Sequence, residues 1–133
     1  MTQQIRGNPS ARFSAVPPRL GFLGVGWIGR HRMQAILATG AVDAVAVADP
    51  STEMASEAVK LAPGARLVSS FEDILDLGVD GVVIATPSAM HAEQSIRALE
   101  RGASVFCQKP LGRHAAEVQA FEDAARRADR LLC

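Results

Sequence analysis

Three glycines with the spacing G-x-G-x-x-G are the feature that most constrains how this sequence can fold. Gly24, Gly26 and Gly29 follow an apolar segment and open a segment of helical periodicity. In a strand–turn–helix unit the first glycine permits a tight turn, the second lets backbone approach a pyrophosphate, and the third allows close helix packing. Free N–H groups at the helix N-terminus also favour phosphate. The spacing therefore predicts a dinucleotide-binding loop.

Two large side chains lie inside this loop and are predicted to belong to the same cofactor-binding site. They are Trp27 and Ile28, between the second and third glycines. Trp27 either packs against the protein or shields the dinucleotide, and the sequence leaves both roles open.

An acidic residue at the expected distance strengthens the prediction. Asp49 lies at the end of the second predicted strand, twenty residues after Gly29, where a carboxylate can accept hydrogen bonds from an adenosine ribose. The alternative is a turn former ahead of Pro50, because Asp-Pro commonly begins a turn. A methyltransferase would also have a glycine-rich loop and an acid after its second strand. The third glycine favours a pyrophosphate ligand instead.

The acid also bears on the choice between NAD and NADP. No Arg or Lys occurs in residues 50–52, directly after Asp49, so the predicted cofactor is NAD. A 2′-phosphate would lie beside the carboxylate and be repelled by it. NADP remains the alternative, because Arg30 or Arg32 could reach that phosphate.

Short β-rich segments alternate with longer helical segments along the rest of the chain. This alternation predicts an α/β fold, a doubly wound parallel sheet of the Rossmann type with helices on both faces. Residues 81–85 do not alternate in polarity, which predicts a strand buried on both faces. The chain ends at residues 131–133 in what looks like the start of a further strand. We expect strands at about 19–23, 42–48, 66–68, 81–85 and 104–107, and helices at about 27–39, 52–61, 71–77, 90–101 and 113–130.

Length and charge limit the domain count and the partners. With 133 residues and 48% hydrophobic content, one domain is expected, over residues 19–133. Fourteen basic and fourteen acidic residues cancel, so neither nucleic acid nor an anionic membrane is an expected partner. The apolar runs are also much shorter than the roughly 20 residues that span a bilayer.

The termini and the cysteines suggest a location. Residues 1–18 contain Arg6, Arg12 and several turn formers but no acid, which predicts a disordered tail, with an organellar transit peptide as the alternative. Only two cysteines occur, Cys107 and Cys133, too few for a disulfide framework, so we expect a cytoplasmic protein. No set of metal-ligating residues stands out.

The second half of the chain resembles a known family. The stretch ATPSAMHAEQSIRALERGASVFCQKPLG, residues 85–112, is similar to the glucose-fructose oxidoreductase and inositol dehydrogenase (Gfo/Idh/MocA) family. The likeness rests on a Thr-Pro after the fourth strand, a histidine four residues beyond that proline, and a Lys-Pro after the fifth strand. It extends from about Arg19 to the C-terminus.

This resemblance implies the cofactor-binding domain of a two-domain oxidoreductase. A C-terminal α/β domain, absent here, would supply most contacts to a sugar, cyclitol or related hydroxy substrate and could support an oligomer. The resemblance assigns Thr86 and Pro87 to the nicotinamide end of the NAD site. It makes Lys109 the catalytic residue, reaching the substrate hydroxyl and the nicotinamide ribose. Such an ammonium would stabilise charge on the carbinol oxygen during hydride transfer. The alternative is a solvated Lys109 followed by a helix-starting proline, Pro110.

Two positions in this half leave function open. Gln108 stands where the family usually has glutamate, so a ribose hydroxyl would meet a weaker acceptor and Lys109 lacks a neighbouring carboxylate. This departure, with the absent second domain, motivates a rival hypothesis: a module that senses or sequesters dinucleotide without catalysis. His91 is counted with the cofactor site, although a histidine in the first turn of a helix is often a packing residue.

Overall fold

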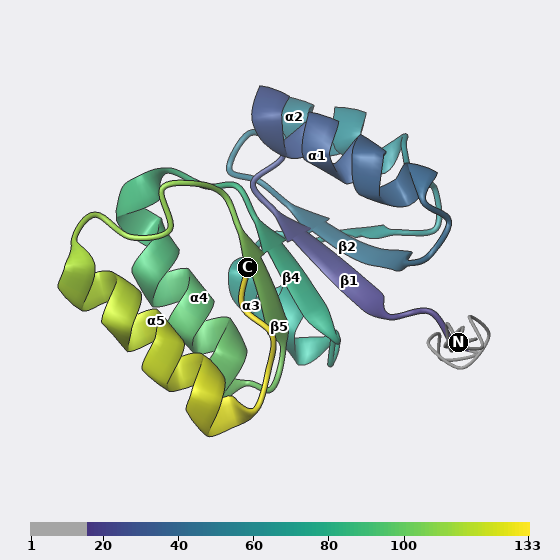
Figure 1. Cartoon of the computed structure of the whole chain (residues 1–133). Coiled ribbons are helices and arrows are strands. Elements are labelled where there is room, and N and C mark those ends of the chain that lie inside the picture. The colour runs from purple at the N-terminus through teal and green to yellow at the C-terminus, as the bar shows by residue number, and fades with distance from the viewer. Residues whose placement is uncertain (1–15) are drawn as a thin grey trace, which may run out of the picture.

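The computed structural model describes residues 16–133 as alternating strands and helices (Figure 1). The predicted tail falls mainly on residues 1–15, which lie outside the described residues. The strands are β1 (Arg19–Leu23), β2 (Asp43–Ala48), β3 (Arg66–Leu67), β4 (Gly81–Ile84) and β5 (Ser104–Cys107), and the helices are α1 (Trp27–Ala38), α2 (Thr52–Val59), α3 (Phe71–Asp76), the 3-10 helix η2 (Ser88–Met90), α4 (His91–Glu100) and α5 (Ala115–Ala128).

All five strands are parallel and are arranged in the order β3-β2-β1-β4-β5. Strand β1 is central, with β2 on one side and β4 on the other. The chain therefore winds outward from β1 in both directions, and the loops after β1 and β4 separate to leave a crevice at the carboxyl ends of the strands. This is the predicted doubly wound sheet.

Helices cover both faces of the sheet, and each face has its own hydrophobic core (Figure 1). On one face α1 and α2 pack against side chains such as Phe22 and Val83. On the other face α3, α4 and α5 pack against Val82 and Ile84. All four residues of β4 are buried, as its unbroken apolar run predicts.

Helix ends follow the local signals in the sequence. The Ser70 hydroxyl caps α3 by accepting from the backbone N–H of Asp73 at 3.1 Å. Gly40 and Gly102 follow α1 and α4 with positive φ, the left-handed conformation in which helices commonly end. One part of an alternative was wrong: Pro110 does not start a helix, because α5 begins only at Ala115.

The end of the chain continues the sheet. The Cys133 N–H donates to the Val105 carbonyl at 2.9 Å, and the Cys107 N–H donates to the Cys133 carbonyl at 2.7 Å. Leu132 forms an isolated parallel bridge with Val105. The predicted start of a further strand is thus confirmed, next to β5. Within residues 16–133, no helix combines the length and apolar character needed to cross a membrane.

Candidate functional site

The glycine loop joins the carboxyl ends of β1 and β4. Gly24 has φ of +83°, and a Cβ there would lie 2.7 Å from the Ala85 carbonyl group, in the segment that follows β4. The Gly24 N–H donates to the carbonyl of Ala48 at 2.9 Å. Only glycine combines this backbone conformation with this closeness, so Gly24 brings three strand ends together.

The other two glycines of the loop differ in how much room surrounds them. A Cβ on Gly29 would overlap the Gly24 carbonyl oxygen, so this glycine allows α1 to pack against the loop. A Cβ on Gly26 would meet nothing within 4 Å, and no side chain caps the N-terminus of α1 that begins there. Open space in front of a helix N-terminus fits a pyrophosphate, because backbone N–H groups and the positive end of the helix dipole face it.

Asp49 is bound to the glycine loop. Its Oδ2 accepts from the N–H of Val25 at 2.9 Å, and its Oδ1 accepts from the N–H of Ser51 at 2.8 Å. The second bond is the local turn contact expected ahead of Pro50. A carboxylate has about four acceptor positions, so both oxygens can still accept from ribose hydroxyls. The turn role and the predicted ligand role are therefore compatible.

One cleft of about 540 Å³ gathers several of the predicted residues at the carboxyl ends of the strands. Gly24, Asp49, Thr86 and Pro87 all line it. Sequence reasoning missed the remaining residues, although the end of a short third strand could have indicated Ser69 to Phe71. The full lining consists of Leu23, Gly24, Ala48, Asp49, Pro50, Ser69, Ser70, Phe71, Thr86, Pro87, Met90 and Gln94.

Gln94 is the most informative of these missed residues. It is buried on α4, and its Oε1 accepts a hydrogen bond of 2.5 Å from the Thr86 hydroxyl. The Thr86 oxygen keeps its own acceptor capacity in the cleft, because its proton is already donated. A glutamine three residues after His91, on the same face of the predicted helix, was the signal available in the sequence.

His91 is buried and is not among the residues that line the cleft. Its side chain is 1% exposed. Nε2 is 2.7 Å from the carbonyl oxygen of Thr86, and Nδ1 is 2.8 Å from that of Pro110. Contact with a cofactor stays a prediction, and both ring nitrogens already have backbone partners.

The loop after β5 carries the predicted catalytic lysine. Gln108 continues the sheet by donating its N–H to the Ile84 carbonyl at 2.8 Å. Lys109 is exposed, is not among the residues that line the cleft, and has no hydrogen bond or ion pair to any described residue. Cys107, the last residue of β5, lies just before this loop. Burial raises the pKa of its thiol, so this cysteine is a packing residue and not an activated nucleophile.

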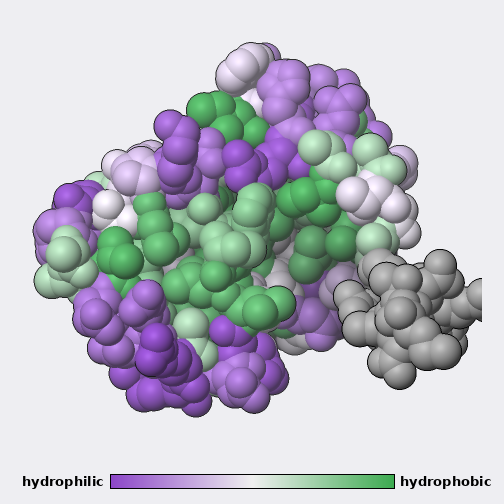
Figure 2. Space-filling view, viewed as in Figure 1, coloured by the Kyte–Doolittle hydropathy of each residue, from purple (hydrophilic) through white to green (hydrophobic). Residues whose placement is uncertain are grey.

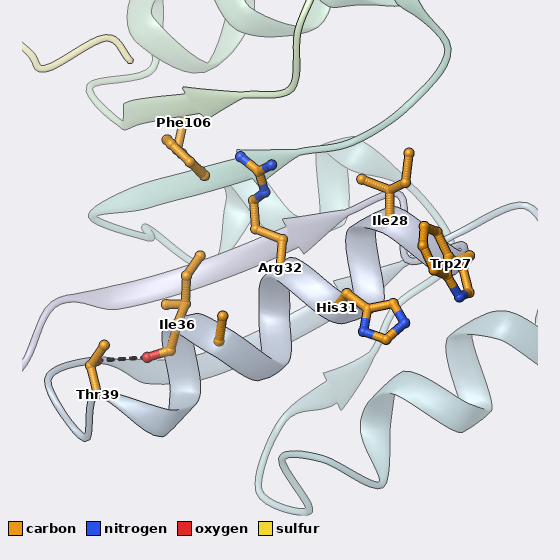
Figure 3. Close-up of a pocket in the computed structure, with 8 residues that line it drawn as sticks. Trp27, Ile28, His31, Arg32, Ile36, Thr39 and Phe106 are labelled. Atoms are coloured by element: carbon orange, nitrogen blue, oxygen red, sulfur yellow. Dashed lines mark hydrogen bonds between the residues drawn. The ribbon is translucent and has the colours of Figure 1, made fainter.

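Trp27 and Ile28 line a different groove, beside α1 (Figure 3). Trp27 is 71% exposed and makes an edge-on contact with His31, with ring centroids 4.7 Å apart. Arg32 reaches across the groove and lies over the Phe106 ring, 4.8 Å from its centroid. Figure 2 shows a largely hydrophobic band across this face of the molecule. The structure thus places these two residues next to the glycine loop but outside the cleft that Asp49 lines.

Comparison with known proteins assigns the family. A profile of the oxidoreductase family with an NAD-binding Rossmann fold matches residues 18–133. The rhizopine catabolism protein MocA of Rhizobium meliloti is 36% identical over 111 residues, which cover 82% of this chain and 34% of that protein. The inositol 2-dehydrogenase of Acidiphilium cryptum is 39% identical over 101 residues, which cover 74% of this chain and 30% of that enzyme.

A solved structure agrees in fold. The WlbA dehydrogenase from Bordetella pertussis, crystallised with NADH and UDP-GlcNAcA, superposes with a TM-score of 0.81 at 28% identity. The match covers 91% of this chain and 36% of that one. The chain thus spans about a third of the length of these proteins. The matched family is one of oxidoreductases, which argues against the methyltransferase alternative. The chain belongs to the Gfo/Idh/MocA family of oxidoreductases and forms its NAD-binding Rossmann domain.

Proposed function

We propose that this chain is the cofactor-binding part of an oxidoreductase that transfers hydride between NAD and a sugar, cyclitol or related hydroxy compound. The observation that carries the proposal is the single cleft shared by Gly24, Asp49 and Thr86, next to the uncapped N-terminus of α1. The names of the relatives support the substrate class, since they include an inositol 2-dehydrogenase and a dehydrogenase crystallised with a nucleotide sugar acid.

Each part of the cleft has a proposed task. The N–H groups at the start of α1 bind the pyrophosphate, with Gly26 leaving room for its close approach. Asp49 accepts hydrogen bonds from the adenosine ribose through its remaining acceptor positions. Thr86 and Pro87 border the nicotinamide end, and Gln94 fixes the Thr86 hydroxyl. Bound NAD supplies the hydride acceptor. Contacts from Trp27, Ile28, His91 and Gln108 to the cofactor remain predictions.

Lys109 is proposed as the catalytic residue. It follows the carboxyl end of β5, the edge where open parallel sheets bind ligands. An ammonium held near the carbinol oxygen stabilises the charge that develops there as hydride leaves. The exposed ammonium has no acidic partner among the described residues and is free to meet a substrate hydroxyl.

We further propose that residues 1–133 bind dinucleotide but do not oxidise a substrate at an appreciable rate. The lining of the cleft is suited to a cofactor. Lys109, outside that lining, is the one predicted site residue with a proposed role toward substrate. Holding the donor carbon near the nicotinamide can contribute roughly 7 to 11 kcal/mol to lowering the barrier. In the longer relatives a second domain would supply that positioning. An oligomer formed through such a domain and a cytoplasmic location remain predictions.

Binding and turnover measurements on the purified chain test this function. Calorimetric titration with NADH, NADPH and S-adenosylmethionine should give binding of NADH and none of S-adenosylmethionine. Absorbance assays for NADH formation with sugars and inositols should give no turnover. Absent NADH binding would contradict the proposal, and rapid turnover would contradict the need for a second domain.

The sensor hypothesis is tested with a longer protein. Gln108 in place of glutamate is the feature that favours it. If a protein that carries this domain together with its substrate domain binds NADH but turns over none of these hydroxy compounds, the sensor hypothesis is favoured. Measurable turnover would exclude it.

A further inference from the structure

One buried side chain connects the two loops that form the nicotinamide end of the site. His91 begins α4, and its ring nitrogens lie 2.7 Å from the Thr86 carbonyl oxygen and 2.8 Å from the Pro110 carbonyl oxygen. Thr86 follows β4, and Pro110 follows β5. In Figure 1 the loop between β5 and α5 passes close to the start of α4. Within residues 16–133, no other hydrogen bond joins residues 85–90 to residues 109–114.

The chemistry of the ring makes this link demanding. Both partners are carbonyl oxygens, which only accept hydrogen bonds, and neutral imidazole carries a single N–H. The imidazolium form satisfies both oxygens, whereas either neutral tautomer turns a lone pair toward one of them. With 1% of the side chain exposed, water cannot replace a missing bond. The position therefore depends on hydrogen-bond donors and not simply on a side chain that fills space.

The two loops carry different parts of the proposed site. Thr86 and Pro87 line the cofactor cleft, and Lys109 immediately precedes the proline that His91 holds. The ladder between β4 and β5 extends only as far as the bond from Gln108 to Ile84. Beyond that bond no strand pairing holds the backbone of Lys109, and the first hydrogen bond after Lys109 along the described chain is the one that the Pro110 carbonyl makes with His91.

We propose that His91 is a positioning residue that fixes the Lys109 loop against the Thr86 loop and so shapes the nicotinamide end of the cofactor site. The proposal rests on the proposed function, because it assumes that a dinucleotide occupies the cleft. Loss of the ring's hydrogen bonds should loosen the nicotinamide end and leave the adenosine end, built from the glycine loop and Asp49, unchanged.

Two variants separate the hydrogen bonds from packing. His91→Phe fills the space that the imidazole ring occupies but donates no hydrogen bond. His91→Gln keeps an N–H donor near the Nε2 position and can retain the bond to Thr86. His114→Gln is the matched control, because that histidine side chain is 62% exposed. Circular dichroism checks that each variant folds, and if His91→Phe does not fold, His91→Gln carries the same test.

Calorimetry with two probes gives the decisive comparison. For His91→Phe the dissociation constant for NADH should rise ~10-fold, whereas that for ADP-ribose, which lacks the nicotinamide, should change less than ~2-fold. His91→Gln should lie between His91→Phe and the unsubstituted chain, and His114→Gln should match the unsubstituted chain. Unchanged NADH affinity in His91→Phe would overturn the proposal. Equal losses for NADH and ADP-ribose would also overturn it, because they indicate general disruption.

Hydrogen exchange in the free protein keeps the two proposals distinguishable. Amides of residues 88–91, of Lys109 and of residues 111–113 should exchange faster in His91→Phe, with the glycine loop unaffected. If the unsubstituted chain binds no NADH, the proposed function fails, and this exchange pattern still decides whether His91 holds the loops. Identical exchange in the variant and the unsubstituted chain would overturn the positioning role.

Discussion

The carboxylate of Asp49 accepts a hydrogen bond from the backbone N–H of Val25, with 2.9 Å between Oδ2 and N. The residue at the end of β2 thus holds the turn that follows β1. Its other oxygen holds the N–H of Ser51. The acid proposed to bind ribose therefore also fixes the glycine loop before any ligand arrives, and substitutions at this position should affect stability as well as binding.

Asp49→Ala should destabilise the free protein. It leaves the part-buried N–H of Val25 without its acceptor, which costs about 1–3 kcal/mol. Asp49→Asn should cost less, because one amide oxygen can still accept from one of the two backbone groups. Denaturant unfolding without cofactor measures both values. Equal stability of Asp49→Ala and the unsubstituted chain would show that the loop holds itself.

NADH should bind more tightly than NADPH, by roughly 10- to 100-fold. A 2′-phosphate about 4 Å from the Asp49 carboxylate would cost on the order of 4 kcal/mol at an effective dielectric of 20, reduced by solvent screening. Arg32 does not relieve this repulsion where it lies in the structure, because its guanidinium packs over Phe106 on β5, three strands from β2 and roughly 14 Å across the sheet. Equal or tighter NADPH binding in calorimetry would contradict the prediction.

Arg30 provides the control for that measurement. The pKa of Glu57 on α2 is lowered mainly by its hydrogen bond to Lys60 and slightly by the charge of Arg30. Arg30→Ala should leave the preference for NADH unchanged. A rise in that preference would identify Arg30 as a ligand of the 2′-phosphate.

The second and third glycines should respond differently to a single methyl group. Gly26→Ala adds a Cβ to open space and should change stability by less than about 0.5 kcal/mol, while NADH affinity falls at least ~10-fold because the pyrophosphate needs that space. Gly29→Ala forces a Cβ into the Gly24 carbonyl oxygen and should destabilise the fold by about 1–3 kcal/mol. Thermal unfolding and calorimetry separate the two effects. Full NADH affinity in Gly26→Ala would argue against a pyrophosphate at this position.

Lys109→Ala in a longer protein that carries the substrate domain should lower turnover far more than cofactor affinity. Removing a donor that stabilises developing charge costs roughly 2.7 to 4 kcal/mol, a hundredfold to a thousandfold in rate. Lys60→Ala is the control, since Lys60 pairs with Glu57 on the surface of α2. Steady-state kinetics decide the matter, and an unchanged turnover number would return Lys109 to a solvated surface role.

Acid should weaken the start of α5 only at low pH. Arg113 contacts Glu117 through three hydrogen bonds of 2.6–3.0 Å, and the guanidinium lowers the pKa of that carboxyl to about 2 from 4.5. A folded-state pKa below the unfolded value gives stability that is present above 4.5 and lost as pH falls through about 2. Glu117→Gln should reduce the change in the free energy of unfolding between pH 4.5 and about pH 2. Glu122→Gln, an exposed residue on the same helix, should leave that pH dependence unchanged. Equal slopes for Glu117→Gln and the unsubstituted chain would refute the ion pair.

Much of the fold could be read from local patterns. Strands β1 and β5 match their predicted bounds, because an apolar segment between turn signals needs little tertiary information. The packing role of Gly29 and the place of Asp49 at the end of β2 could be predicted from their spacing in the sequence, because the glycine loop and the acid follow two consecutive strands. The start of α5 was missed by two residues, because His114 is extended and Arg113 bonds the Glu117 side chain instead of entering the helix.

The sequence by itself determined the order of elements, the glycine loop and the acid, because each depends on neighbours within a few tens of residues. Only the tertiary structure decided which side chains meet across the loops. Phe71, the first residue of α3, meets Asp49 and Thr86 in the cleft although it lies 22 residues after one and 15 before the other. His91 contacts the carbonyl groups of Thr86, five residues before it, and Pro110, nineteen residues after it. These two carbonyl groups lie near each other because β4 and β5 pair side by side. Burial then turns those two contacts into a structural requirement, because water cannot substitute for a lost hydrogen bond there.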